Sequence, residues 1–317
     1  MARDRSAIPS VCQKTCHDVD VTVALLLKVN DGLVLAADSA STLTVGLPDG
    51  QQSVLNTYNN ANKVFNLHKD LPIGAMTWGL GNIGPSAIAT LAKDVRRRFH
   101  GDSAAHQDWS VDASQYAIHG VAERVRDFLH GEKYEPLATS AAVDGVNPGE
   151  LGFLVAGYSA DADEPTAYVM NVNSSGQPEL VEILPEGTTG AQWWGQPDAL
   201  ARILNGTSIA FPQALLNIGA VQDINDAMQL GSAVQPELNA QLIAAPMPIQ
   251  DAIDLAEFLV YATIQFVRFT PGPPTVGGPI EIATITKHEG FKWVRRKHYF
   301  DTRLNPMVRG AVHAELA

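Results

Sequence analysis

The sequence has few cysteines, no long apolar run and no excess of basic residues. Only Cys12 and Cys16 occur among 317 residues, which is too few for a disulfide framework and lacks the paired spacing of a zinc site. Scarce cysteine is typical of a reducing compartment, so we expect a cytoplasmic protein. No stretch reaches the roughly 18 apolar residues of a membrane span. Residues 1–21 lack the apolar segment of a secretory signal, so we expect no role at a membrane.

The balance of charge is acidic. The formal net charge is -12, from 22 basic and 34 acidic residues. A general nucleic-acid binder needs a basic surface, so we expect no nucleic-acid partner. Short basic runs do occur at residues 96–98 and 295–297, but such runs usually lie at solvated ends of helices or strands. Hydrophobic residues make up 45% and charged residues 18% of the chain, which is typical of a globular domain with a sizeable core.

The most informative stretch is residues 22–41, TVALLLKVNDGLVLAADSAS. Two apolar runs flank Asn30, Asp31 and Gly32, and Asp-Gly between such runs is a strong hairpin signal. Thr22 opens the first predicted strand and Asp38 closes the second, so the hairpin should bring their side chains together. A hydroxyl beside a carboxylate can serve as a nucleophile with its orienting group. The alternative is that Thr22 is an ordinary strand residue, because β-branched side chains favour strands.

The segment KVNDGLVLAADS, residues 28–39, resembles the opening hairpin of proteasome β subunits. Mature members of that family begin with a threonine, and counting back from Asp38 places it at Thr22. The family also has a lysine that opens its third strand beside the threonine, and Lys63, followed by Val64 and Phe65, matches it. The resemblance implies that Gly79, in a glycine-rich stretch after the next strand, donates its N–H to an oxyanion. The loop from residue 39 to 62 is about ten residues longer than in typical members.

A second resemblance lies at residues 153–158, FLVAGY, which matches the family's central hairpin. Between the two matches, apolar residues at helical spacing predict helices over about 85–99 and 110–130, with Ser110 as N-cap and Gly131 as the stop signal. Further strands are expected at 167–172, 179–184, 280–286 and 291–295, with helices at 198–204 and 249–269.

Strands and helices that occur in groups predict an α+β fold rather than alternating βαβ units. The resemblance refines this to the four-layer αββα sandwich of the N-terminal nucleophile (Ntn) hydrolases. We expect three parts: an N-terminal arm or removable propeptide at 1–21, the domain at 22–298, and a polar tail at 299–317. Residues 207–247 have no counterpart in a compact family member and are expected to form a helical insertion.

Several positions depart from the family pattern. The family's Asp-x-x-Ser-Gly-Gly turn aligns on Gly277 and Gly278, which places Pro273 at the aspartate and Val276 at the serine; Thr275 is the nearest hydroxyl. Gln196 stands where the family has another serine. Val21 replaces the glycine that usually precedes the scissile bond.

Three functions follow from the resemblance. The first is a proteasome-type threonine peptidase or amidohydrolase, with catalytic residues Thr22, Asp38, Lys63 and Gly79, no cofactor and no metal. Its substrates would be peptides or proteins, and it would form a homo-oligomer or ring. The second is a non-catalytic structural or assembly subunit. The third is a small-molecule amide hydrolase on the same fold, with residues 207–247 shaping its pocket.

Overall fold

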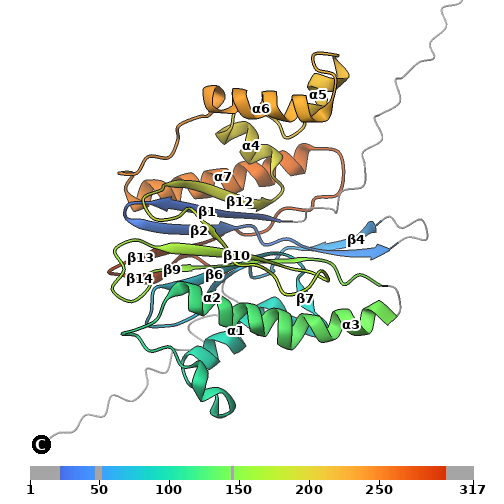
Figure 1. Cartoon of the computed structure of the whole chain (residues 1–317). Coiled ribbons are helices and arrows are strands. Elements are labelled where there is room, and N and C mark those ends of the chain that lie inside the picture. Colours follow the sequence, from blue (N-terminus) through green and yellow to red (C-terminus); the bar gives the residue numbers. More distant parts are fainter. Residues whose placement is uncertain (1–21, 47–51, 144–145, 298–317) are drawn as a thin grey trace, which may run out of the picture.

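The computed structural model describes residues 22–46, 52–143 and 146–297. It has the predicted α+β composition, with helices and antiparallel sheets (Figure 1). The predicted N-terminal arm or propeptide at 1–21, the last residue of the predicted domain at 298 and the tail at 299–317 lie outside the described residues. No helix in the described part of the chain combines the length and apolar character needed to cross a membrane.

The first sheet has five strands in the order β12-β1-β2-β13-β14. Its members are β1 (Val23–Val29), β2 (Gly32–Ala37), β12 (Gly190–Gly195), β13 (Glu281–Thr286) and β14 (Gly290–Arg295). The predicted hairpin is its centre, with Asn30 and Asp31 in the turn. Every residue of β1 and β2 is buried, which explains why both strands read as continuous apolar runs.

The second sheet also has five strands, in the order β11-β10-β9-β6-β5. Its members are β5 (Val64–Asn66), β6 (Ile73–Gly79), β9 (Leu151–Gly157), β10 (Thr166–Val172) and β11 (Val181–Ile183). Two short hairpins stand apart from both sheets: β3 (Ser41–Gly46) with β4 (Gln52–Tyr58), and β7 (Asn82–Ile83) with β8 (Ser86–Ala87). The sequence did not predict β3 and β4, which occupy the long loop between Asp38 and Lys63.

The two sheets face each other, and side chains alternate between their two faces. Along β1, Val23 and Leu25 pack towards helix α7 (Ile249–Phe269), whereas Ala24 and Leu26 pack against residues of the second sheet such as Met76. Period-two alternation of this kind follows from the pleat of a strand. The sheet-to-sheet core therefore lies directly behind the hairpin that carries Thr22 and Asp38.

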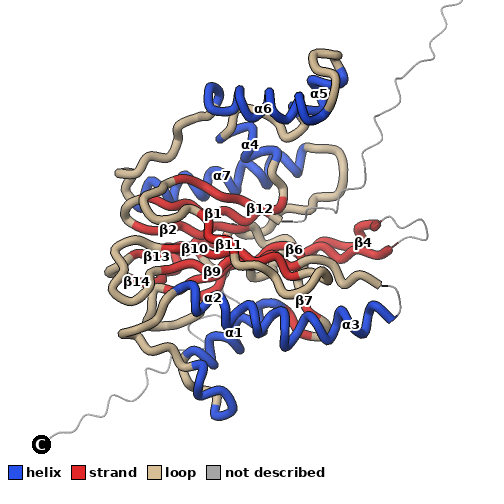
Figure 2. Tube along the Cα trace, viewed as in Figure 1, coloured by secondary structure: helices blue, strands red, loops and turns tan. Residues whose placement is uncertain are grey.

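Helices cover the outer faces of both sheets (Figure 2). Those beside the second sheet are α1 (Ile88–Phe99), α2 (Ile118–Arg126), a π-helical segment (Asp127–Tyr134) and α3 (Glu135–Val143). Those beside the first sheet are α4 (Asp198–Leu204) and α7 (Ile249–Phe269). The segment 207–247 is helical as expected and contains α5 (Phe211–Asn217) and α6 (Ile224–Leu238), which pack together on the α4 side of the molecule (Figure 1). A short 3₁₀ segment (Ala104–Trp109) joins α1 to the residues before α2.

Two predicted boundaries of the second helix are wrong. Ser110 is not its N-cap, because α2 begins at Ile118, whose N–H donates to Ser159 Oγ at 3.0 Å. The cap is thus a hydroxyl from a distant loop. Gly131 does not end the helix, which continues through the π-helical segment into α3. Tertiary packing overrides the glycine there, since Tyr134 is fully buried and its hydroxyl donates to Gly149 O at 2.6 Å.

The start of the first helix also differs from the prediction. The helix predicted over about 85–99 begins later, because Pro85 lies between β7 and β8 and α1 begins at Ile88. Residues 190–195, which were not predicted as a strand, form β12 and pair antiparallel with β1. This pairing is non-local, and it places Gly195 opposite Val23 at the edge of the site described next.

Candidate active site

The ends of β1 and β2 place Thr22 and Asp38 at one end of the central hairpin. Thr22 immediately precedes β1 and is 3% exposed. Asp38 immediately follows β2 and is fully buried, and its N–H donates to Val23 O at 3.2 Å. On the other side, Gln196 N–H donates to Thr22 O at 2.7 Å. Backbone hydrogen bonds from two neighbouring segments therefore hold the chain at Thr22.

Lys63 joins these two side chains. Its Nζ lies 2.8 Å from Thr22 Oγ1 and 2.5 Å from Asp38 Oδ1. Lys63 is 5% exposed and lies just before β5, so a residue of the second sheet reaches the end of the first. The pKa of Lys63 is lowered, because burial outweighs the opposing effect of the negative charges of Asp38 and Glu281. Three residues far apart in the sequence thus form one buried, hydrogen-bonded group.

The Asp38 carboxylate is held by the backbone as well as by Lys63. Its Oδ1 accepts the Val23 N–H at 3.1 Å, and its Oδ2 accepts the N–H groups of Ala40 and Gly277 at 2.9 and 3.0 Å. A buried carboxylate that accepts several N–H groups is fixed in position by them. Asp38 can therefore orient Lys63 with little freedom of its own.

Gly79 lies at the wall of the same pocket as Thr22 and Lys63. The pocket has a volume of about 480 Å³ and is lined mainly by residues 40–42, 58–63 and 77–82. Gly79 has a φ of +78°, and a Cβ there would lie 2.4 Å from Glu150 O. The fold alone therefore requires glycine at this position. A backbone without a side chain also lets a substrate carbonyl approach closely.

The β3–β4 hairpin borders the pocket, since Ser41, Thr42 and Tyr58 belong to its lining. No residue of 207–247 does. Gly195 closes the site on the β12 side, where its φ is +86° and a Cβ would lie 1.9 Å from Thr22 O. Only glycine permits this approach, which keeps the edge strand in contact with the residue that carries the hydroxyl.

The positions at which the sequence departs from the resembled pattern, 196 and 273–276, do not bring a carboxylate or a serine hydroxyl to Thr22. Pro273 is exposed and Val276 is buried among apolar residues beneath α7, so neither offers a polar group to Thr22. Thr275 is 3% exposed, and its Oγ1 accepts from Gln196 Nε2 at 3.5 Å. The turn still contributes to the site through its backbone, because the Gly277 N–H binds Asp38.

Two charged residues near Lys63 were missed by the sequence reasoning. Glu281 is 1% exposed, and its Oε2 accepts the backbone N–H of Lys63 at 3.0 Å. Lys297 Nζ lies 3.5 Å from Glu281 Oε1. A lone acid at the start of the apolar strand 281–286 was a usable signal for Glu281. Nothing distinguished Lys297 from the other members of the basic run 295–297.

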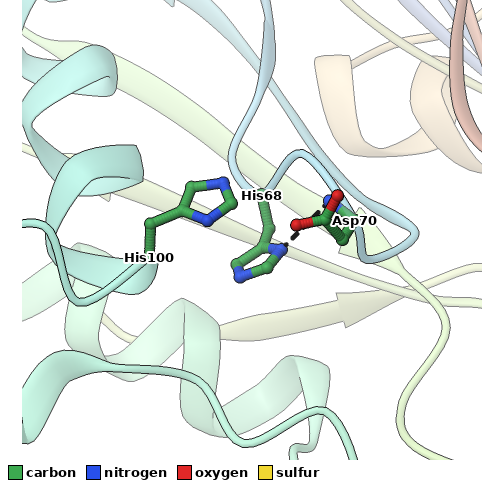
Figure 3. Close-up of side chains that lie close together, drawn as sticks. All are labelled: His68, Asp70 and His100. Atoms are coloured by element: carbon green, nitrogen blue, oxygen red, sulfur yellow. Dashed lines mark hydrogen bonds between the residues drawn. The ribbon is translucent and has the colours of Figure 1, made fainter. Parts of the chain in front are cut away.

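One group of possible metal ligands exists among the described residues, at His68, Asp70 and His100 (Figure 3). The two imidazole rings are stacked, with centroids 4.0 Å apart. His68 Nδ1 accepts the Asp70 N–H at 3.3 Å, and His100 Nε2 accepts the Lys69 N–H at 3.0 Å. A metal ion at these nitrogens would have to displace both hydrogen bonds. The two stacked rings and their hydrogen bonds tie the loop before β6 to the end of α1.

We expect this pair of histidines to make stability depend on pH. Burial, followed by the proximity of His100, lowers the pKa of His68. Because the folded-state pKa lies below the unfolded value of about 6.5, the stabilising contribution is present above that pH and is lost as the pH falls through the folded-state pKa. The measurement is the urea midpoint from pH 8 to pH 5. His100→Gln should flatten the decline, whereas the exposed-site control His288→Gln should follow the wild type; equal slopes for all three proteins would contradict the expectation.

Neither known family models nor curated proteins give a match to this chain.

Proposed function

We propose that this protein is a proteasome-type threonine peptidase or amidohydrolase that uses Thr22 as its N-terminal nucleophile. One observation carries the proposal: Lys63 Nζ bridges Thr22 Oγ1 and Asp38 Oδ1 at 2.8 and 2.5 Å, with all three residues buried beside a pocket of about 480 Å³. A hydroxyl in contact with a buried ammonium is unusual for a purely structural threonine. It is the arrangement expected of a polarised nucleophile.

The proposed reaction begins with removal of residues 1–21, which frees the α-amine of Thr22. A free α-amine titrates near pH 8, at about the value needed for a general base in neutral solution. The amine accepts the hydroxyl proton while Oγ1 attacks the amide carbonyl of the substrate. The N–H of Gly79 stabilises the resulting oxyanion, a contribution worth about 3 kcal/mol in comparable enzymes.

The remaining steps use the same groups. The ammonium formed on Thr22 returns its proton to the leaving amine as the C–N bond breaks, which leaves an ester on Oγ1. Water, activated by the α-amine, then hydrolyses the ester and restores the hydroxyl. Lys63 stays positively charged throughout and favours loss of the hydroxyl proton, and Asp38 holds Lys63 in place.

The proposal includes the four-layer αββα sandwich of the Ntn hydrolases. The cores on either side of the two facing sheets, and the helices outside them, support that refinement. Peptide or protein substrates, a homo-oligomer or ring and a cytoplasmic location belong to the same proposal, and they rest on the resemblance of residues 28–39 and 153–158.

The second candidate is a non-catalytic subunit with the same fold. It is favoured by Pro273 and Val276, which provide no carboxylate or hydroxyl where the family has them. The third candidate, a small-molecule amide hydrolase with a pocket shaped by the insertion, has less support, since residues 207–247 do not line the pocket at Thr22.

The experiment that separates the first two candidates is intact-mass measurement and N-terminal sequencing of the purified protein. We expect the active protein to begin at Thr22 and to hydrolyse fluorogenic peptide amides. A chain that keeps Met1 or Ala2 under all conditions cannot use the α-amine of Thr22, and it would support the non-catalytic subunit. Hydrolysis of short amides without hydrolysis of peptides would favour the third candidate.

A further inference from the structure

A second buried ion pair lies directly behind the group formed by Thr22, Lys63 and Asp38. Its carboxylate belongs to Glu281, the first residue of β13, and its ammonium belongs to Lys297, two residues after β14. The side chains are only 1% and 7% exposed. Burying two charges is costly, and the reaction described above uses neither of them.

We propose that Glu281 and Lys297 are positioning residues that hold Lys63 between Thr22 and Asp38. The inference rests on the proposed function, because it assigns the pair to the same reaction. It adds two residues, from β13 and from the segment after β14, to a site otherwise built from β1, β2 and β5.

Glu281 acts on the main chain of Lys63. Its Oε2 accepts the Lys63 N–H at 3.0 Å and lies 3.5 Å from the Val64 nitrogen. Lys63 immediately precedes β5, and Val64 is the first residue of β5 and pairs with Met76 of β6. The carboxylate therefore fixes the point from which the Lys63 side chain extends to Thr22.

Lys297 acts on both segments that border this point. Its Nζ donates to Ser39 Oγ at 2.6 Å and to the carbonyl oxygen of Ala61. Ser39 follows Asp38, and Ala61 lies two residues before Lys63. The Ser39 hydroxyl in turn donates to Pro279 O at 2.5 Å, close to Glu281 in the chain. One ammonium thus joins the segment that carries the carboxylate to the segment that carries the lysine.

The four charges alternate in sign. The pKa of Lys297 is lowered, mainly by burial and also by repulsion from Lys63. The negative charges of Glu281 and Asp38 act in the opposite direction and raise this pKa. The same repulsion acts on Lys63, because Coulomb interactions are mutual. Removing the charge of Lys297 should therefore raise the pKa of Lys63, and removing the charge of Glu281 should lower it.

The test uses the full chain and measures the Lys63 ammonium by ¹³C NMR of protein labelled at lysine Cε, in parallel with peptide-amide hydrolysis. We expect the pKa of Lys63 to rise in Lys297→Met, to fall in Glu281→Gln and to stay near the wild-type value in Lys297→Arg. In Lys297→Met, kcat should fall about 100-fold with little change in KM, the usual result of displacing a catalytic group by about 1 Å. Lys297→Arg should recover most of this loss.

Lys292→Met is the matched control, because it removes an exposed lysine from β14. Glu281→Gln is close to isosteric, so it tests the inference if Lys297→Met does not fold. An unchanged pKa of Lys63 in both variants, with kcat equal to that of Lys292→Met, would overturn the inference. Failure of the proposed function has a different signature: a wild-type protein without hydrolytic activity, in which the two opposite pKa shifts would still support the positioning roles.

Discussion

Replacing Thr22 with alanine should leave the chain at full length and without hydrolytic activity. The Thr22 hydroxyl contacts Lys63 Nζ at 2.8 Å, and in the proposed reaction it attacks both the bond that precedes it and the substrate amide. Alanine offers neither nucleophile nor hydrogen-bond acceptor, so we expect hydrolysis of peptide amides to fall by about 10⁴-fold or more. Intact mass reports the first effect, and initial rates with a fluorogenic peptide report the second.

Thr22→Ser is the matched control, because serine keeps the hydroxyl and loses only the methyl group. It should still be processed and should retain measurable activity. Full activity in Thr22→Ala would rule out the mechanism, whatever the state of the N-terminus. We expect Thr22→Ala to fold, because Thr22 precedes β1 and contributes no side chain to the apolar cores.

The parts of the site that local sequence patterns encode were predictable. The β1–β2 hairpin follows from two apolar runs around Asp-Gly, and its length alone places Thr22 and Asp38 at the same end. Lys63 was found through the apolar residues that follow it and through the resemblance. For the fold, the long apolar stripe of 249–269 gave α7 with its correct bounds.

The missed features depend on contacts that no local pattern records. The cap of α2 is Ser159 from a loop after β9, and β12 forms because an edge of β1 is available to it. In the site, the turn before β13 supports Asp38 through the backbone N–H of Gly277, so this support cannot be read from a side chain. Glu281 and Lys297 become relevant only once β13 lies beside β2 and β14 lies beside β13, which is a property of the sheet order.

The second large effect concerns stability, and we expect it from Asp38→Asn. The substitution leaves the buried Lys63 ammonium without its direct partner. It also places an amide where the wild-type carboxylate accepts three backbone N–H groups. Breaking a buried ion pair by removing one partner costs about 3–5 kcal/mol. Urea denaturation of Asp38→Asn should therefore show a loss of this size, and a loss below about 1 kcal/mol would contradict it.

Lys63→Met is the informative comparison, because it breaks the same ion pair from the other side. Methionine fills much of the space of the lysine stem, and Asp38 keeps its three backbone hydrogen bonds. We expect a smaller loss of stability than in Asp38→Asn, together with a loss of activity as complete as in Thr22→Ala. A folded Lys63→Met variant that hydrolyses peptides at the wild-type rate would show that the ammonium has a structural role only. Equal stability losses in the two variants would instead mean that the backbone donors contribute little to holding Asp38.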